Sequence, residues 1–144
     1  MKRAMLLLAV AFWTRDARAQ ITVSGSPAQM TVSAAVAGLA PTAVSNSLTT
    51  YSVTNPTGQN TFTITAQINA AMPTNVTLEI TLQSAGQGSS AGAVSLTTTA
   101  GTVITGIKQK VTGATITYQL SATSDAGVVP VQTRVVTFTA ITVP

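Results

Sequence analysis

The stretch GSSAG (88–92) fits the pattern G-x-S-x-G, in which the central serine, here Ser90, is a catalytic nucleophile. Such a serine sits on a strand-to-helix turn and takes its reactivity from a histidine base. The chain contains no histidine, and a strand rather than a helix is expected after residue 92. The sequence therefore favours a loop at 88–92 over a nucleophile.

The remaining ionisable side chains offer no better catalytic set. A serine–lysine dyad needs a buried, deprotonated lysine, whereas Lys108 and Lys110 in IKQKV share one parity, as expected of an exposed strand end. Glu79 and Asp125 are the acidic residues beyond residue 19, and a glycosidase would need both in one cleft. We expect a protein that is not an enzyme, with no catalytic residue and no cofactor.

Metal and nucleic-acid sites are also excluded by composition. Zinc would need histidine or cysteine, and the chain has neither. Calcium sites usually gather several carboxylates. Three cations and two anions remain beyond residue 19, a net charge of 3 − 2 = +1, which is too little for a phosphate-binding surface. We expect no bound metal and no nucleic-acid partner.

The first 19 residues have the layout of a secretory signal peptide. A basic start and an apolar run of about ten residues (2–13) precede the small residues Ala17 and Ala19. The apolar run is too short to cross a bilayer as a mature helix. We expect a helix over 3–14, cleavage between Ala19 and Gln20, and no membrane attachment afterwards, with an uncleaved anchor as the alternative.

Beyond residue 19 the chain alternates polar and apolar residues in short segments, as in NTFTITAQI (60–68). Alternation with a period of two predicts strands, and clusters of Gly, Pro, Asn and Asp predict the turns between them. The expected strands cover 20–24, 29–37, 47–54, 60–69, 75–83, 92–98, 102–107, 114–122 and 131–142. Strands at this spacing predict an all-β fold, an antiparallel β-sandwich formed by one domain, 20–144.

The parity of each segment separates a buried face from a hydrated face. Threonine suits the hydrated face, because its branched side chain favours a strand and its hydroxyl binds water. The expected core residues are Phe62, Ile64, Ile68, Val76, Leu78, Ile80, Leu82, Ile116, Tyr118, Leu120, Val136 and Phe138. The expected outward threonines are Thr61, Thr63, Thr65, Thr77, Thr81, Thr115, Thr117, Thr137 and Thr139.

The stretch GATITYQLSATSDAGVVPVQTRVVTFT (113–139) resembles the final hairpin of fibronectin type III and related immunoglobulin-like domains. In those domains a strand with an inward tyrosine runs through a loop into the last strand, and Tyr118 with ATSDAG (122–127) is similar. The resemblance implies an immunoglobulin-like topology, with a jelly roll as the alternative. The chain departs from the family because residues 20–144 lack the usual core tryptophan.

The same region of the chain is almost free of charge, with none between Gln20 and Leu78. Soluble β proteins normally protect their sheet edges with charged side chains, so an uncharged surface suits packing between subunits. We expect an exported structural or adhesive cell-envelope protein, secreted to the periplasm or the exterior, that assembles with itself, as a fimbria-like subunit does, or with other envelope proteins. The candidate assembly strand contains Ile21, Val23, Met30 and Val32, and it pairs either with its own sheet or with a neighbouring subunit.

A secreted binding module is the alternative function. Its ligand site would lie in the loops GQGSSAG and SDAG, with Ser89, Ser90 and Asp125 as candidate contacts. A glycan is a candidate ligand, although sugar-binding sandwiches usually present exposed aromatic rings, and the parity of this chain's aromatic residues places most of them inward.

Overall fold

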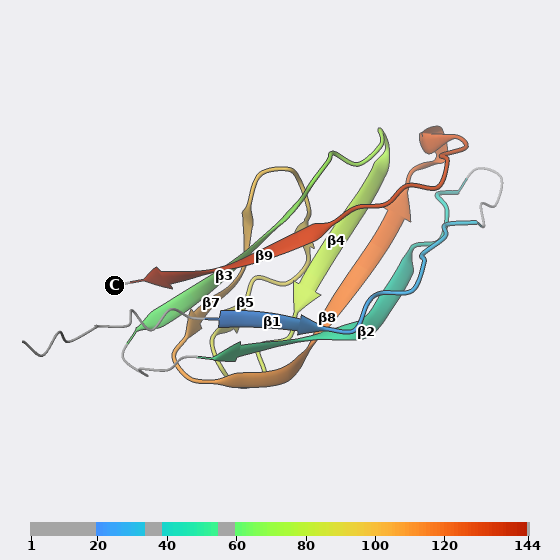
Figure 1. Cartoon of the computed structure of the whole chain (residues 1–144). Helices are drawn as coiled ribbons and strands as arrows, with labels where there is room; N and C mark the ends of the chain where they lie inside the picture. Colours follow the sequence, from blue (N-terminus) through green and yellow to red (C-terminus); the bar gives the residue numbers. More distant parts are fainter. Residues whose placement is uncertain (1–19, 34–38, 55–59, 144) are drawn as a thin grey trace, which may run out of the picture.

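The computed structural model describes residues 20–33, 39–54 and 60–143. Two antiparallel sheets face each other around one core, as the alternation of polar and apolar residues predicts for a β-sandwich (Figure 1). The expected signal helix, with Ala17 and Ala19, lies outside the described residues.

The larger sheet has the strand order β1-β2-β8-β4-β6. Its strands are antiparallel to their neighbours throughout. The central strands are long and the last is very short: β1 (Gln20–Ser24), β2 (Val44–Thr54), β8 (Val111–Ala122), β4 (Val76–Leu82) and β6 (Val94–Ser95).

The smaller sheet has the order β5-β7-β3-β9 and is also antiparallel. Its strands are β5 (Ser89–Ser90), β7 (Gly101–Ile107), β3 (Thr61–Ile68) and β9 (Val136–Val143). A single 3₁₀ turn, η1 (Ser124–Ala126), follows β8. The pair β5–β7 corrects one expectation, because residues 89–90 form a short strand and not a loop. Gly88 makes this pairing possible: a Cβ there would lie 2.3 Å from the Thr105 carbonyl oxygen.

The core is formed by the inward parity of both sheets. Of the twelve residues expected there, eight are buried, whereas Val76, Leu120, Val136 and Phe138 are only half-buried. All four line one surface cleft, which is described below. The buried apolar residues are Tyr51, Val53, Phe62, Ile64, Ala66, Ile68, Leu78, Ile80, Leu82, Leu96, Val103, Ile104, Ile107, Val111, Ala114, Ile116 and Tyr118.

Irregular pairing brings residues into the core that simple alternation does not predict. The register between β3 and β7 shifts after Ile64, so that the consecutive residues Val103 and Ile104 are both fully buried. The register between β2 and β8 shifts between Asn46 and Thr49. These shifts have the character of β-bulges, which re-aim the side chains that follow them.

The outer faces carry threonine as expected, with one exception. Thr65 is buried, being only 9% exposed, and it lies on β3, which has β7 and β9 as neighbours on its two sides. Thr77, Thr137 and Thr139 are exposed. The hydroxyls of Ser47 and Thr117 hydrogen-bond to each other at 3.0 Å across the outer face.

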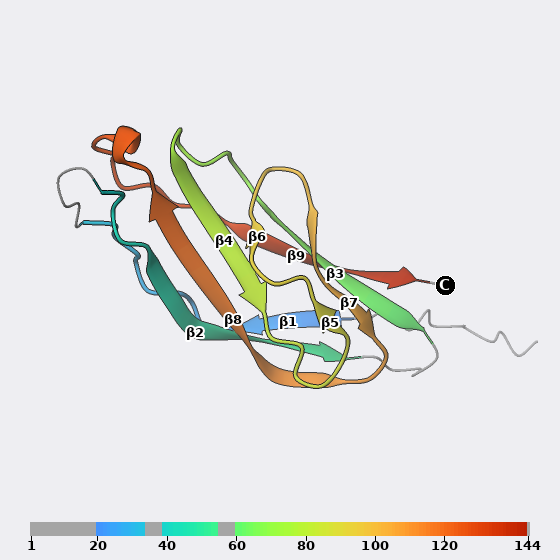
Figure 2. The ribbon, with the colours of Figure 1, turned by 180° about the vertical axis from the view of Figure 1, so that it is seen from behind.

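The two sides of the sandwich end differently. On one side the sheets end in the two-residue strands β5 and β6, which offer almost no backbone for pairing. On the other side they end in β1 and β9, which lie side by side in both ribbon views (Figures 1 and 2). We call this second side the open side.

Two expected strands are paired over a shorter range than predicted, or not at all, among the described residues. Residues 29–33 of the expected strand 29–37 run on from β1 with no strand assignment, and residues 34–37 lie outside the described residues. Residues 131–135 likewise precede β9 without one, so β9 begins five residues later than expected. Apolar residues of these two segments line a cleft between them and do not pair in a sheet.

Candidate functional site

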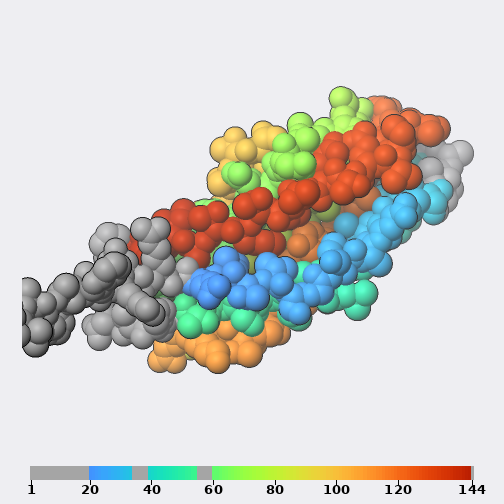
Figure 3. All heavy atoms as spheres, in the orientation of Figure 1, coloured from blue at the N-terminus to red at the C-terminus, as the bar shows by residue number. Residues whose placement is uncertain are grey.

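A cleft of about 500 Å³ lies on the open side, and we call it the edge cleft. One wall is the run after β1, from Gly25 to Val32, and the other is the run before β9, from Ala126 to Val136. Figure 3 shows these two runs, blue and red-orange, bordering a furrow with orange β8 atoms between them. Its volume falls in the range of ligand pockets, about 300–1,000 Å³.

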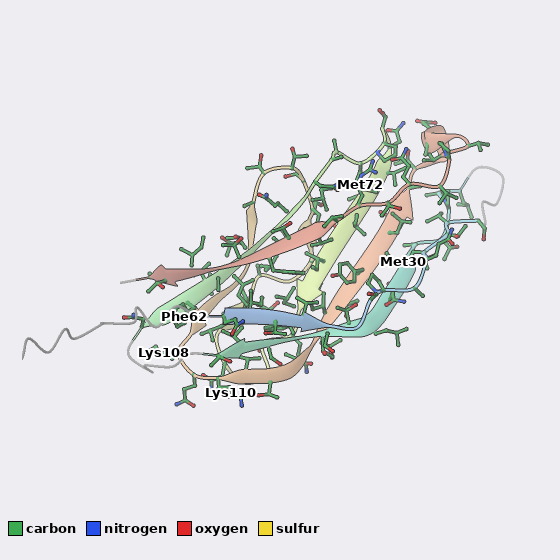
Figure 4. The ribbon with its side chains drawn as sticks, in the orientation of Figure 1. Met30, Phe62, Met72, Lys108 and Lys110 are labelled. Carbon is green, nitrogen blue, oxygen red and sulfur yellow. The ribbon has the colours of Figure 1, made fainter. Side chains whose placement is uncertain are left out.

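The floor and walls of the edge cleft are mainly apolar. Tyr118 and Leu120 reach it from β8, and Phe138 reaches it from β9. Met30 and Met72 line it near the end of the molecule away from Lys108 and Lys110 (Figure 4). Methionine side chains adapt to differently shaped partners, so the cleft suits an apolar group more than a polar one.

Arg134 is the one charged residue among the described residues that line the edge cleft. Its guanidinium donates from Nε and Nη2 to the Ala71 carbonyl oxygen at 3.2 and 2.7 Å, and from Nη1 to the Thr133 carbonyl oxygen at 3.0 Å. A third group, Gln132 Oε1, also accepts from Nη2. The bonds to Ala71 tie the run before β9 to the loop that follows β3, and the guanidinium places a positive charge at the cleft wall.

Thr49 lines the same cleft and is 1% exposed, yet its Oγ1 has no hydrogen-bond partner among the residues that the structure describes. A buried hydroxyl without a partner costs about 1–3 kcal/mol. The register shift between Asn46 and Thr49 interrupts the alternation of β2, so that Thr49 is buried and the preceding residue, Leu48, is 71% exposed. The sequence contains no signal for this shift, and neither Thr49 nor Arg134 is predicted from it as a site residue.

Tyr51, two residues further along β2, shows how a polar group is satisfied in this core. Its ring is fully buried, and its hydroxyl donates to the Gln83 carbonyl oxygen at 2.6 Å. Burial raises the pKa of the Tyr51 phenol to about 12. Burial also raises the pKa of Tyr118, on the floor of the edge cleft.

The backbone of β9 is the second feature of the open side. β9 pairs with β3 from Val136 to Val143 without a register shift, and among the described strands nothing pairs with its other edge. It contains no charged residue and no proline. Val135, Ile141 and Val143 are exposed beside this edge, by 57%, 47% and 42%. A long, uncharged free edge of this kind is a template for another strand.

The candidate ligand residues of the loops do not come together at the edge cleft. Ser89 and Ser90 form β5 and pair with Thr105 and Ile104, while Asp125 lies in η1. Ala126 and Gly127, the neighbours of Asp125, line the cleft, but the two serines do not. Ser90 Oγ accepts a hydrogen bond of 3.2 Å from the Gly92 amide, which is a local turn contact.

The candidate assembly residues lie along the cleft wall. β1 pairs with β2 of the same chain, from Gln20 opposite Thr54 to Ser24 opposite Thr50. Ile21 and Met30 pack against the core, whereas Val23 is 40% exposed and lines the cleft together with Val32. Within one chain β1 therefore takes the intramolecular arrangement of the two considered from the sequence.

Two features are absent from the described part of the chain. It holds no group of three or more His, Cys, Asp or Glu side chains that could bind a metal ion. It also holds no helix with the length and hydrophobicity needed to cross a bilayer.

Comparison with protein-family models, with curated proteins and with solved structures found no match to this chain. Its function is therefore argued from the open side alone.

Proposed function

We propose that this protein is an exported, non-catalytic structural or adhesive protein of the cell envelope, whose copies join through the open side of the sandwich. The observation that carries the proposal is the difference between the two sides. Two-residue strands end both sheets on one side, whereas the uncharged strands β1 and β9 end them on the other. A protein that protects one pair of edges and leaves the other free is suited to adding strands there.

We further propose that the sandwich has an immunoglobulin-like topology, which would fit this assembly. We assign β1-β2-β8-β4 to strands A, B, E and D of such a domain, and the neighbours β3 and β9 to C and F. This assignment differs from the resemblance of residues 113–139 to a final hairpin, because β8 and β9 lie in different sheets and do not pair with each other. In a complete domain strand G pairs with F. In this assignment the free edge of β9 is the position of G, and β5, β6 and β7 are additions between D and E.

The surface chemistry points the same way. The residues from Gln20 to Leu78 carry no charge, and β9 carries none either. Joining two such edges therefore desolvates no charged side chain, which would otherwise oppose association. Export follows from the predicted signal peptide, residues 1–19.

The test is the oligomeric state of the chain beginning at Gln20. We expect light scattering after size exclusion to show oligomers whose proportion rises with protein concentration, and electron microscopy to show defined particles. Because the contacts are uncharged, adding 1 M NaCl should not dissociate them. A monomer at every concentration would reject the proposal.

The edge cleft favours the alternative function, a secreted binding module. Its apolar lining and the positive charge of Arg134 suit an amphipathic anion better than a sugar. The probe is anilinonaphthalene sulfonate, an apolar fluorophore with one negative charge. Ala122→Trp, on the cleft floor, should abolish the fluorescence gain, and Gln119→Trp, on the exposed face of β8, should not. Equal signals from both variants would exclude the edge cleft as the binding site.

A further inference from the structure

We propose that the strand added to the free edge of β9 is β9 of a second copy, paired antiparallel about a two-fold axis through Thr139. This inference rests on the proposed assembly function and specifies its partner and register. Three observations lead to it: the direction of the β9 backbone groups, the pattern of exposed apolar side chains, and the absence of charge.

The direction of the backbone groups follows from one hydrogen bond beyond the end of β9. The Asn69 amide donates to the Val135 carbonyl oxygen at 3.1 Å, and the Val135 amide donates to Asn69 Oδ1 at 2.9 Å. Val135 therefore faces β3. Backbone groups alternate along an antiparallel strand, and β9 pairs without a register shift. The residues that point their N–H and C=O groups to the free edge are Val136, Phe138, Ala140 and Thr142.

An independent contact agrees with this alternation. The Ile68 amide, opposite Val136, donates to the Thr97 carbonyl oxygen at 2.9 Å and so points away from β9. Ile68 and Val136 are then a pair that exchanges no hydrogen bonds, and Val136 directs its own groups to the open side.

The two-fold axis through Thr139 uses all four outward residues. It places Phe138 of each copy opposite Ala140 of the other, and Val136 opposite Thr142, so that these pairs exchange hydrogen bonds. Thr139 then lies opposite Thr139 of the second copy in a pair whose side chains approach closely. The smaller sheet becomes one continuous sheet across the two copies.

The exposed apolar side chains select this register. With the axis at Thr139, Val135 of each copy lies opposite Val143 of the other, and both are exposed in the single chain, by 57% and 42%. Ile141, 47% exposed, lies opposite Thr137. Moving the axis by one residue in either direction separates Val135 from Val143. The register at Thr139 therefore gives each of these valines an apolar cross-strand neighbour.

Charge substitution at the axis tests the proposal. Thr139 is exposed on the outer face, so Thr139→Lys and Thr139→Glu should leave the fold of the single chain intact. Each variant alone places like charges opposite each other and should raise the dimer dissociation constant by up to about fivefold. An equal mixture should restore dimers that contain one copy of each, because the charges are then opposite. Thr77→Lys and Thr77→Glu, exposed on the outer face of β4, are the matched controls and should not change the dissociation constant.

Cysteine cross-linking tests the register separately. The chain has no cysteine, so a thiol introduced by Thr139→Cys can form a disulfide only with the same position of a second copy. Directly opposite residues of this kind lie about 4.5 Å apart at Cα, within disulfide range. Thr137→Cys, which would face Ile141 and not itself, is the control that should not cross-link.

The outcomes separate this inference from the assembly function. Oligomers that tolerate both Thr139 charge variants would overturn the β9 pairing and leave assembly through another edge. Loss of oligomers in each variant without restoration in the mixture would overturn the two-fold axis. A wild-type chain that is always monomeric would reject both proposals.

Discussion

At the scale of single residues, Phe62 and Thr63 show how the two faces of one strand differ in energetic weight. Phe62 is 1% exposed in the centre of the core, whereas Thr63 is half-buried on the outer face. Phe62→Ala should lower the free energy of unfolding by about 3–5 kcal/mol, since it leaves a cavity. Thr63→Ala should lower it by less than about 1 kcal/mol. Urea denaturation measures both, and a larger effect at Thr63 would contradict the register of β3.

Thr49 is a residue whose removal should stabilise the protein. Thr49→Val replaces a buried hydroxyl, for which the described part of the chain offers no partner, by a methyl group of similar size. We expect the free energy of unfolding to rise by about 1 kcal/mol, because the desolvation cost of the hydroxyl disappears. Thr49→Ser keeps the hydroxyl, removes a methyl and should be destabilising. A lower midpoint for Thr49→Val in thermal unfolding would show that the hydroxyl has a partner in solution.

Tyr51 makes stability depend on pH in the alkaline range. Burial raises its pKa to about 12, from an ordinary value near 10. The folded state therefore favours the neutral phenol, so the stability that this residue contributes is complete below about pH 10 and is lost as the pH rises toward 12. Denaturant unfolding between pH 9 and 12 should show this decline, and Tyr51→Phe should reduce it. An equal decline in both proteins would assign the effect to other groups.

At the scale of elements, β1 and β9 are both edge strands but contribute unequally. β1 has five residues, of which only Ile21 packs against the core. β9 has eight residues and pairs with β3 along its whole length. We therefore expect that the chain can fold without β1 but not without β9.

Deletion of Gln20 to Ser24 measures this difference. The shortened chain should still fold, with a loss of about 1–3 kcal/mol from the buried area of Ile21 and the lost pairing with β2. Because β9 is untouched, its oligomers should persist by light scattering. Folded monomers would show that β1 carries the contact between copies, as in the strand exchange considered from the sequence. A chain that no longer folds would place β1 in the essential core.

At the scale of the whole molecule, the predicted signal peptide determines where the mature chain would begin. The predicted cleavage after Ala19 makes Gln20, the first residue of β1, the first residue of the mature protein. Mass spectrometry of protein secreted by a bacterial host should give the mass of a chain that begins at Gln20, with or without cyclisation of this glutamine. A mass that includes Met1 to Ala19 would favour the anchored alternative. Ala19→Arg should block cleavage, since the site requires a small residue.

The local alternation of polar and apolar residues is sufficient to predict an all-β fold. Alternation in 60–68, 75–82 and 114–120 predicts strands with a known inward parity, because a side chain in a strand has only two directions to point. Phe62, Ile80 and Ile116 are accordingly buried. The near-absence of charge, also visible in the sequence, predicts an uncharged strand edge but does not identify it.

Only the tertiary structure decided which edges are free and where the cleft lies. Pairing between distant segments, such as β3 with β9 and β2 with β8, depends on the packing of all strands together and not on any one of them. The register shifts beside Thr49 and Val103 likewise involve partner strands, β8 and β3, that lie far away in the sequence. Arg134 reaches the cleft because the chain returns past Ala71, a contact 63 residues away in the sequence. Alternation determines the faces of a strand, whereas its neighbours are determined by the whole sandwich.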